Sequence, residues 1–487
     1  MTPSPSIDAG ANGGNVGRTA AGGIQAADVQ AGPRLDRLPV GRFHRRILLL
    51  VGAGMFLDAF DIYLQGGVLG ALVHDGWSTP EVNATFLFVT FMGMLVGAGA
   101  SGVIGDRYGR RVSYQINLAI FGIASLAAVF APTMNALIAL RFVMGVGLGA
   151  EIVVGYATVS EFIPPERRGR WVGLLSMLTN LAVTATGLIG YVVIPTIGWG
   201  AMFAIVGIGA VIVWFMRKEM PESPRWLESR GRFAEADALL RRIEDEAGGA
   251  ASLPRPRPVT IAPGSDVPDR IGYLFSPRML RHTLLAVMVG VVMPTALYGF
   301  NGWIPTFLVK QGHGVAATLG FTAVMGLGAP LGAWIGAVIA DRWGRRPGIV
   351  VLSLAWAAAG VAYALAATEA QIMALGFCVV VGAYALNSVS YAIYIPELFP
   401  TRLRLRGASI AGAAGRLASA GAQFGVVWAF TGGGIGAVAA CLAGLLVFQA
   451  VIVGLFGVET RQRSLEDLAR VDDPAGPAMP LTTERAG

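Results

Sequence analysis

Two nearly identical stretches decide the fold: Gly105-Asp106-Arg107-Tyr108-Gly109-Arg110-Arg111 and Ala340-Asp341-Arg342-Trp343-Gly344-Arg345-Arg346. Each stretch lies in a short polar turn between two long apolar runs, at corresponding places in the two halves of the chain. A second pair, Glu161-Phe162-Ile163-Pro164 and Glu397-Leu398-Phe399-Pro400, is separated by nearly the same interval. The shared residue order and the equal spacing indicate an internal repeat of two parallel halves.

The composition is typical of a membrane protein. Of the 487 residues, 54% are apolar and only 14% are charged, whereas a soluble domain carries about 25% charged residues. A helix needs roughly 20 apolar residues to cross a bilayer, and the chain offers twelve such runs. They are residues 47–73, 82–104, 112–131, 136–161, 171–195, 200–217, 282–308, 315–340, 347–367, 371–396, 407–430 and 434–456. We therefore expect an all-α membrane protein with 12 transmembrane helices in two six-helix repeats.

The placement of arginines predicts the orientation and the parts of the chain. Arginine blocks precede the first span and follow the second and fourth spans of each half, whereas most intervening turns lack Lys and Arg. By the positive-inside rule both termini should be cytoplasmic, so the net charge of +7 reflects topology rather than nucleic-acid binding. The expected parts are a disordered tail (1–40), a six-helix bundle (41–217), a cytoplasmic linker with an amphipathic helix (218–281), a second bundle (282–457) and a cytoplasmic tail (458–487).

The repeated motif and the spans resemble the major facilitator superfamily of transporters over residues 40–470. This resemblance implies a substrate site near the midplane, between two halves that rock against each other. It also implies that the motif turns form a cytoplasmic gate, whose ion pairs break when the halves move. The residues expected at the gate are Asp106, Arg107, Gly109, Arg110, Glu161, Arg168, Asp341, Arg342, Gly344, Arg345 and Glu397.

Local strings indicate a branch of that superfamily. Pro221-Glu222-Ser223-Pro224-Arg225 and Glu459-Thr460-Arg461 resemble the cytoplasmic signatures of sugar porters and of their metabolite:proton symporter relatives. Asp58-Ala59-Phe60-Asp61 is similar to the Asp-Gly-Phe-Asp of aromatic-acid:proton symporters, and Ala150-Glu151 is closer to the niacin-type symporters. The paired-Gln and Gly-Pro-x-Pro-Trp stretches of sugar porters are missing from the sequence.

Asp58, Asp61 and Glu151 lie inside apolar runs and are the candidate proton-coupling residues. An ionised group at the bilayer centre costs roughly 2.5–3.5 kcal/mol on insertion scales, so it persists mainly where it faces a partner or a wet cavity. Asp58 and Asp61 share one helix face, and the repulsion between their charges favours binding of a proton. The alternative is that one Asp neutralises a structural arginine and the other is merely hydrated.

The candidate substrate-binding residues are buried arginines and a set of polar and aromatic residues. A buried guanidinium suits a carboxylate, which belongs either to the substrate or to a neighbouring helix. Tyr and Asn at helical spacing suit a flat amphiphilic substrate or, alternatively, hydrogen bonds between helices. The expected contacts are Arg416, Arg141, Gln65, Tyr298, Asn301, Tyr384, Asn387 and Tyr391.

These residues favour a transporter over an enzyme. The sequence has no Gly-x-x-x-x-Gly-Lys-Ser/Thr segment, which argues against direct drive by ATP, and its four His residues are scattered near span ends. We expect neither a metal nor another cofactor. The expected function is proton-coupled import of a small organic anion, such as an aromatic or other carboxylate, by a monomer in a bacterial inner membrane. A sugar or polyol porter of the same fold and a non-transporting membrane sensor are the alternatives.

Overall fold

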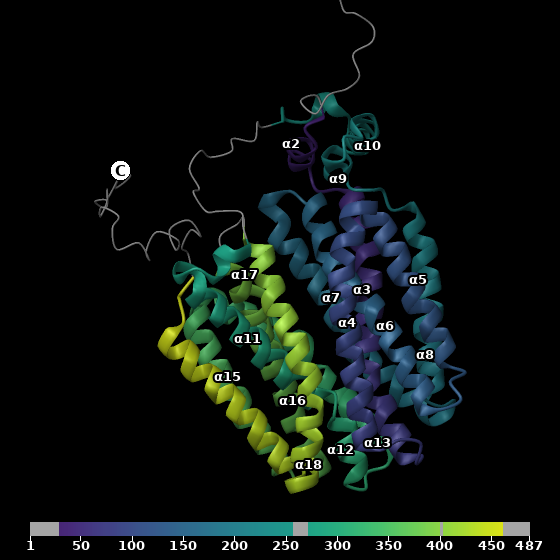
Figure 1. Ribbon diagram of the computed structural model, residues 1–487, viewed down its shortest axis with the longest axis vertical. Helices are drawn as coiled ribbons and strands as arrows, with labels where there is room; N and C mark the ends of the chain where they lie inside the picture. Colours follow the sequence, from purple (N-terminus) through teal and green to yellow (C-terminus); the bar gives the residue numbers. More distant parts are fainter. Residues whose placement is uncertain (1–28, 257–270, 400–402, 461–487) are drawn as a thin grey trace, which may run out of the picture.

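A computed structural model describes residues 29–256, 271–399 and 403–460. Within these ranges the chain is built from helices and has no strands. Figure 1 shows two groups of long helices side by side, the first half of the chain in purple to blue and the second in teal to yellow. We call the end that carries the turns at Gly109 and Gly344 the arginine-rich end, and the opposite end the far end.

The described part of the first half contributes six long helices to its bundle. They are α3 (Arg42–His74), α4 (Pro80–Tyr108), α5 (Arg110–Ala128), α6 (Met134–Phe162), α7 (Pro165–Thr196) and α8 (Gly200–Met216). Thr79 and Thr133 cap the first turns of α4 and α6 by accepting backbone hydrogen bonds. Glycines then allow α4 and α6 to touch, because a Cβ at Gly97 or Gly149 would collide with the facing backbone.

The second half repeats this pattern with more interrupted helices. They are α11 (Pro277–Asn301), α12 (Ile304–Lys310), α13 (Val315–Gly326), α14 (Gly328–Arg342), α15 (Arg345–Ala364), α16 (Glu369–Leu386), the π-helix η4 (Asn387–Tyr394), α17 (Ile395–Glu397) and α18 (Arg404–Phe456). At Gly433 and Gly434 the backbone of α18 leaves the helical conformation, so this helix contains two consecutive spans.

The helices account for the twelve predicted spans. Ten helical segments in the described ranges are long and apolar enough to cross a membrane. The last of them, Arg406–Phe456, supplies two spans because of the glycine kink, and α5 supplies the span predicted at 112–131 with 19 residues. The predicted all-α fold with twelve transmembrane helices in two repeats is therefore confirmed.

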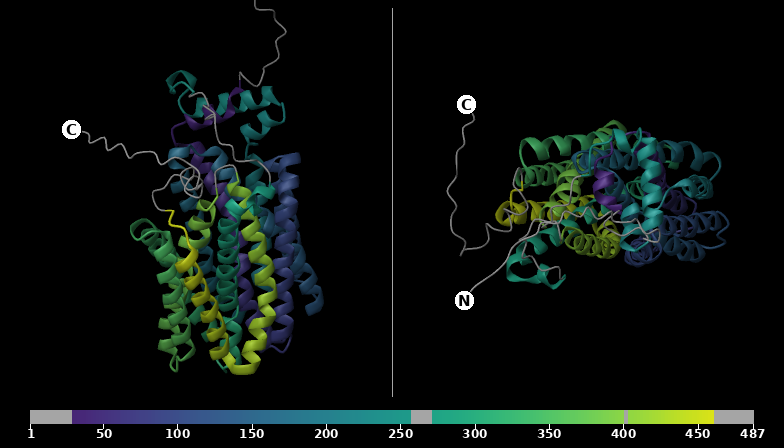
Figure 2. Two further views of the ribbon diagram at one scale, coloured as in Figure 1. Left: turned by 60° about the vertical axis from the view of Figure 1, so that its left-hand side comes forward. Right: turned by 90° about the horizontal axis from the view of Figure 1, so that it is seen from above.

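Short helices form a cap over the arginine-rich end of the first bundle (Figure 2). This cap consists of η1 (Arg217–Glu219), α9 (Pro224–Ser229), α10 (Phe233–Glu246) and α2 (Ala31–Asp36). The prediction of a disordered tail over 1–40 is wrong for α2, because apolar and ionic contacts hold it against α10. Leu35 is buried in the same cluster as Leu240 and Ile243.

Two arginines of the N-terminal segment hold the cap together. Arg34 lies 2.7 Å from both Asp237 and Glu244, and Arg37 lies 2.6 Å from Glu244. Burial acts to raise the pKa of Glu244, but the hydrogen bonds and charges of Arg34 and Arg37 outweigh it and hold that pKa below the ordinary value of 4.5. Because the folded pKa is depressed, this contribution to stability is complete at neutral pH and disappears as the pH falls through the folded pKa.

We expect Arg34→Ala to release α2 from the cap. A hydrogen bond to a charged group contributes about 1.5–3 kcal/mol, so amide hydrogen exchange in residues 31–36 should accelerate about tenfold to a hundredfold at neutral pH. In the unmodified protein, the same segment should be less protected from exchange once the pH falls below the folded pKa of Glu244, after correction for the pH dependence of the intrinsic exchange rate. Arg45→Ala, a change at an exposed site on α3, is the control; equal exchange in both variants would contradict the assignment.

Candidate functional site

The guanidinium of Arg141 is enclosed by α3 and α4 in the first bundle. Its Nη1 lies 2.5 Å from Oδ2 of Asp61, and its Nε donates to Thr90 at 3.0 Å. Its Nη2 donates to the carbonyl of Asp61 and to Oε1 of Gln65, both at 3.3 Å. Arg141 and Asp61 are both completely buried. The structure thus pairs Arg141 with the first span, which was the alternative to a contact with substrate, and places Gln65 in the same network.

A second buried ion pair joins Glu151 of α6 to Arg217, the first residue of η1. Nη2 of Arg217 lies 2.5 Å from Oε1 of Glu151, and the two side chains are 1% and 2% exposed. The guanidinium also donates to the carbonyls of Leu50 and Val51 and lies 4.5 Å from the ring centroid of Tyr114. The guanidinium of Arg217, directly after α8, therefore neutralises the carboxylate of Glu151, one of the candidate proton-coupling residues.

Gly54 of α3 makes room for this second pair. A Cβ at Gly54 would collide with Nη2 of Arg217 and would lie 2.5 Å from Oε1 of Glu151. The ion pair consequently rests directly on the backbone of α3, one turn from Asp58.

Asp58 lies next to both ion pairs and belongs to neither. Its side chain is 2% exposed, and its Oδ2 has no hydrogen-bond partner among the described residues. Glu151, Arg217 and Asp61 are all close enough to interact with it electrostatically. Among the described residues of this region, three carboxyl groups therefore share two guanidiniums. If all three carboxyls were ionised, one negative charge would be in excess.

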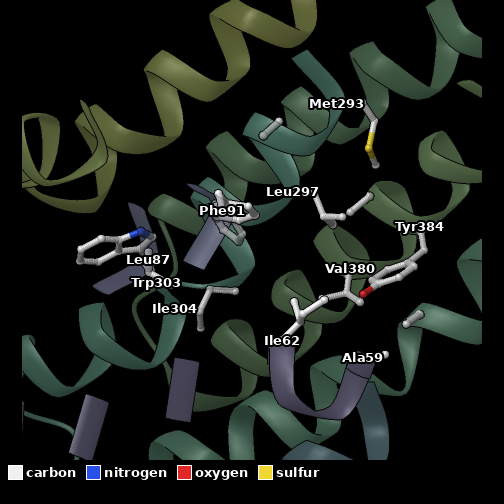
Figure 3. Packing of buried hydrophobic residues seen from close by; sticks show 14 of the residues in the cluster. Ala59, Ile62, Leu87, Phe91, Met293, Leu297, Trp303, Ile304, Val380 and Tyr384 are labelled. Atoms are coloured by element: carbon white, nitrogen blue, oxygen red, sulfur yellow. The ribbon is translucent and has the colours of Figure 1, made fainter. Parts of the chain in front are cut away.

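A hydrogen bond between two tyrosines joins the bundles near the middle of the molecule. The hydroxyl of Tyr384 in α16 donates to that of Tyr63 in α3 at 2.5 Å. Figure 3 shows the hydroxyl end of Tyr384 turned toward the part of α3 that carries Ala59 and Ile62. Tyr384 was a predicted contact, whereas Tyr63 was not, since a single Tyr in a long apolar run gives no pattern.

Further predicted contacts gather on the second bundle around Arg416. Tyr298 is close enough to Tyr63, Tyr391 and Arg416 to interact with them electrostatically. A Cβ at Gly412 would lie 3.3 Å from the hydroxyl of Tyr391 and 3.5 Å from Nη1 of Arg416. The hydroxyl of Tyr391 and the guanidinium of Arg416 therefore both lie next to Gly412, where α18 has no side chain.

The π-helix η4 carries Asn387 and Tyr391, both half-buried. Its wider winding changes the register after α16, so the α-helical spacing predicted from the sequence for Tyr and Asn does not hold beyond Leu386. π-helical turns occur frequently at functional sites. No residue pattern in the sequence indicates this local geometry.

A cavity of about 80 Å³ lies between the two bundles, and Tyr63 is one of the residues that line it. Its wall is mostly apolar, with polar groups from Tyr63, Thr186, Asn301 and Thr322. Oδ1 of Asn301 is buried and has no hydrogen-bond partner among the residues that the structure describes. The predicted contact Asn301 thus lines a cavity that residues of both bundles form.

The two repeated turns have the same structure at the arginine-rich end. Gly109 and Gly344 adopt φ values of +99° and +97°. Glu222 accepts the backbone N–H groups of Arg110 and Arg111 at 2.8 and 3.2 Å. Correspondingly, Glu459 accepts those of the two arginines that follow Gly344, both at 3.0 Å. Neither glutamate was predicted at the gate, although both belong to the quoted cytoplasmic strings.

In each turn an arginine also forms an ion pair with a glutamate of its own bundle. Arg110 lies 3.2 Å from Glu161, and Arg345 lies 2.9 Å from Glu397. Asp341 is exposed, at 3.8 Å from Arg345. Arg107 and Arg342 are exposed as well, and the side chains of Asp106 and Arg168 lie outside the described part of the structure. Four of the predicted gate residues thus meet as two equivalent pairs.

The sequence model of the Major Facilitator Superfamily matches residues 51–423. This chain belongs to that superfamily. It is 39% identical over 447 residues to the inner membrane metabolite transport protein YdjE of Escherichia coli, covering 91% of this chain and 99% of the relative. It is 32% identical to the niacin transporter NiaP of Acinetobacter baylyi, covering 89% and 98% of the two chains.

The fold is also that of solved superfamily members. The xylose transporter XylE from E. coli, in a partially occluded inward open conformation, superimposes with a TM-score of 0.68 at 20% identity, covering 87% of this chain and 100% of that one. As a superfamily member with metabolite transporters as relatives, the protein is a membrane transporter and not an enzyme.

We expect Gly109→Ala to destabilise this superfamily member through the repeated turn. The φ of +99° and ψ of +165° at Gly109 fall in a region that is essentially restricted to glycine, and forcing another residue into it costs about 1–3 kcal/mol. The added Cβ would also collide with Glu222. Thermal unfolding in detergent should shift downward by a few degrees.

Gly99→Ala is the matched control, because Gly99 lies in α4 and a Cβ there meets no atom within 4 Å. Gly344→Ala should reproduce the shift, since a Cβ there would lie 2.7 Å from Oε2 of Glu459. Equal melting temperatures for the Gly109 and Gly99 variants would show that the turn does not require glycine.

Proposed function

We propose that this transporter is a proton symporter that imports a small organic anion, such as an aromatic or other carboxylate, by alternating access. The observation that carries the proposal is the imbalance of buried charge around Asp58. In the described part of the first bundle, Asp58, Asp61 and Glu151 face Arg141 and Arg217 alone. A proton is the smallest species that can restore neutrality there.

Asp58 is the group that we assign to carry the proton. Asp61 and Glu151 each have a guanidinium at 2.5 Å, so protonating either of them would leave a buried cation without its partner, which is strongly unfavourable. Protonating Asp58 instead leaves two carboxylates and two guanidiniums. With Asp58 protonated, the three carboxyls and two guanidiniums are neutral overall and can be enclosed between the bundles. With Asp58 ionised, the same groups carry one negative charge and favour access to water. Binding and release of the proton would thereby follow the rocking of the halves.

The proposed substrate site is the region of Arg416 and the tyrosines. Arg416 is half-buried and forms no ion pair with any described residue, so its planar fork is available for a carboxylate. Tyr298 and Tyr391 supply flat apolar surfaces with hydrogen-bonding tips. The similarity to a niacin transporter supports this class, because niacin is a small aromatic carboxylate.

Contacts between the bundles support an inward-facing state. Thr184 of α7 donates to the carbonyl of Gly326 at 3.0 Å, and Gly66 and Gly70 of α3 lie against Pro305. These contacts lie in the middle and toward the far end. At the arginine-rich end, by contrast, the gate ion pairs in the described ranges each stay within one bundle. The halves would separate there.

The remaining parts of the proposal concern the orientation of the chain in the membrane and its surroundings. By the positive-inside rule the arginine-rich end and both termini are cytoplasmic. The protein would work as a monomer in the lipid bilayer of a bacterial inner membrane, driven by the proton gradient without a cofactor. In the two experiments below, a sugar or polyol porter would be stabilised by the sugars, and a non-transporting sensor would accumulate no labelled substrate even without a substitution.

We expect carboxylates to stabilise the purified protein through Arg416. Nicotinate or benzoate should raise its melting temperature, whereas xylose and glucose should not. Arg416→Gln should weaken binding about tenfold to a hundredfold, because it removes a charge-assisted hydrogen bond worth about 1.5–3 kcal/mol. Arg278→Gln, at an exposed site in the first turn of α11, is the control. Stabilisation by the sugars alone would indicate a sugar porter.

We expect Asp58→Asn to uncouple transport from the proton gradient. In proteoliposomes with an imposed pH gradient, accumulation of labelled nicotinate or benzoate should fall at least about tenfold, because the variant cannot bind or release the proton. Exchange of labelled for unlabelled substrate at equal pH should persist, since exchange moves no net proton. Asp75→Asn, at an exposed position after α3, serves as control. Unchanged accumulation in the Asp58 variant would refute the proton site.

A further inference from the structure

We propose that a groove at the arginine-rich end of the first bundle binds the phosphate headgroup of an anionic phospholipid. The groove has a volume of about 760 Å³ and lies between the start of α5, η1 and the cap helices α9 and α10. It shares no lining residue with the cavity between the two bundles, and it lies beside the repeated turn whose backbone N–H groups Glu222 accepts.

Charge complementarity favours an anion in this groove. Among the described residues that line it, Arg46, Arg111, Lys218, Arg232 and Arg242 are basic, and Glu219, Glu222 and Glu235 are acidic. Two of these glutamates are already neutralised, because Arg46 lies 2.5 Å from Glu219 and Arg232 lies 2.6 Å from Glu235.

The remaining groups leave positive charge unbalanced. Glu222 is engaged by the backbone N–H groups of Arg110 and Arg111. Arg111, Lys218 and Arg242 form no ion pair with any residue that the structure describes. Three cations converging from α5, η1 and α10 match the charge and the oxygen acceptors of a phosphate group.

The position of the groove favours a lipid over a soluble phosphate. The ammonium of Lys218 lies 4.1 Å from the ring centroid of Trp214 and 4.5 Å from that of Phe215. This is the arrangement of a basic side chain that lies along apolar surface with its charge at the membrane interface. Phe215 is 57% exposed, and Tyr108 and Val112, which line the groove, are 53% and 40% exposed.

These exposed apolar side chains belong to the ends of membrane spans, next to the groove's basic residues. A phospholipid could therefore place its acyl chains against α5 and α8 while its phosphate meets Lys218 and Arg111. A bound headgroup would also connect Arg242 of the cap to α5, whose first turn begins at the repeated gate motif.

The test measures retention of lipid by the full-length protein. In native mass spectrometry, phosphatidylglycerol should remain bound more strongly than phosphatidylcholine. The variant that combines Lys218→Gln with Arg242→Gln should bind phosphatidylglycerol more weakly, by about fivefold for each charge removed. Arg242→Gln alone, at an exposed position of α10, should give the intermediate value even if the double variant is unstable.

The control variant combines Arg45→Gln with Arg278→Gln, which removes two exposed cations outside the groove. Its affinity for phosphatidylglycerol should equal that of the unmodified protein. Equal weakening in the control and the groove variant would overturn the proposal in favour of diffuse attraction. Equal retention of the two lipids, or thermal stabilisation by inorganic phosphate as large as that by phosphatidylglycerol, would overturn it as well.

Discussion

The first bundle depends on how it accommodates charge at membrane depth. Arg141 of α6 contacts Asp61 of α3 and Thr90 of α4, and the pair of Glu151 with Arg217 adds the end of α8. Leaving one member of such a buried pair alone costs about 3–5 kcal/mol. Packing between these helices therefore has to preserve both pairs, and it places Asp58 within electrostatic reach of Glu151, Arg217 and Asp61.

The second bundle has a different chemical character. Its described central residues present tyrosine hydroxyls and one arginine without an acidic partner, rather than ion pairs. The hydrogen bond from Tyr384 to Tyr63 joins this surface to α3, the same helix that carries Asp58. One helix thus carries Asp58 and also contacts the interface between the halves, which would give the proposed symport a direct physical route for coupling a proton to a substrate.

Much of the fold was readable from the sequence because long apolar runs and repeated arginine turns are strong local signals. Asp58, Asp61 and Arg141 were found for the same reason, since charges inside apolar runs stand out. The partner of Glu151 was missed because Arg217 adjoins Lys218 at a span end, where basic residues usually mark topology. Which carboxyl pairs with which arginine depends on the packing of helices distant in sequence, and no single span contains that information.

Other features were missed because they depend on local backbone geometry. The winding of η4 and the ordered α2 have no clear signature in residue type. The backbone hydrogen bonds that Glu222 and Glu459 accept form only when remote segments meet the repeated turns. The equivalence of these two sets of hydrogen bonds shows that the duplication extends beyond the membrane spans. Each half brings its own acidic residue from a following segment to the start of its third span.

Gly54 has a consequence for the motion of the molecule. Because an ion pair occupies the place of its side chain, α3 cannot slide along α6 or turn about its own axis without stripping two charges of each other. That penalty favours a rigid connection between α3 and α6. Displacement during the proposed transport cycle would then be concentrated in the interface between the halves, where tyrosine hydroxyls and small apolar contacts can exchange partners at little cost.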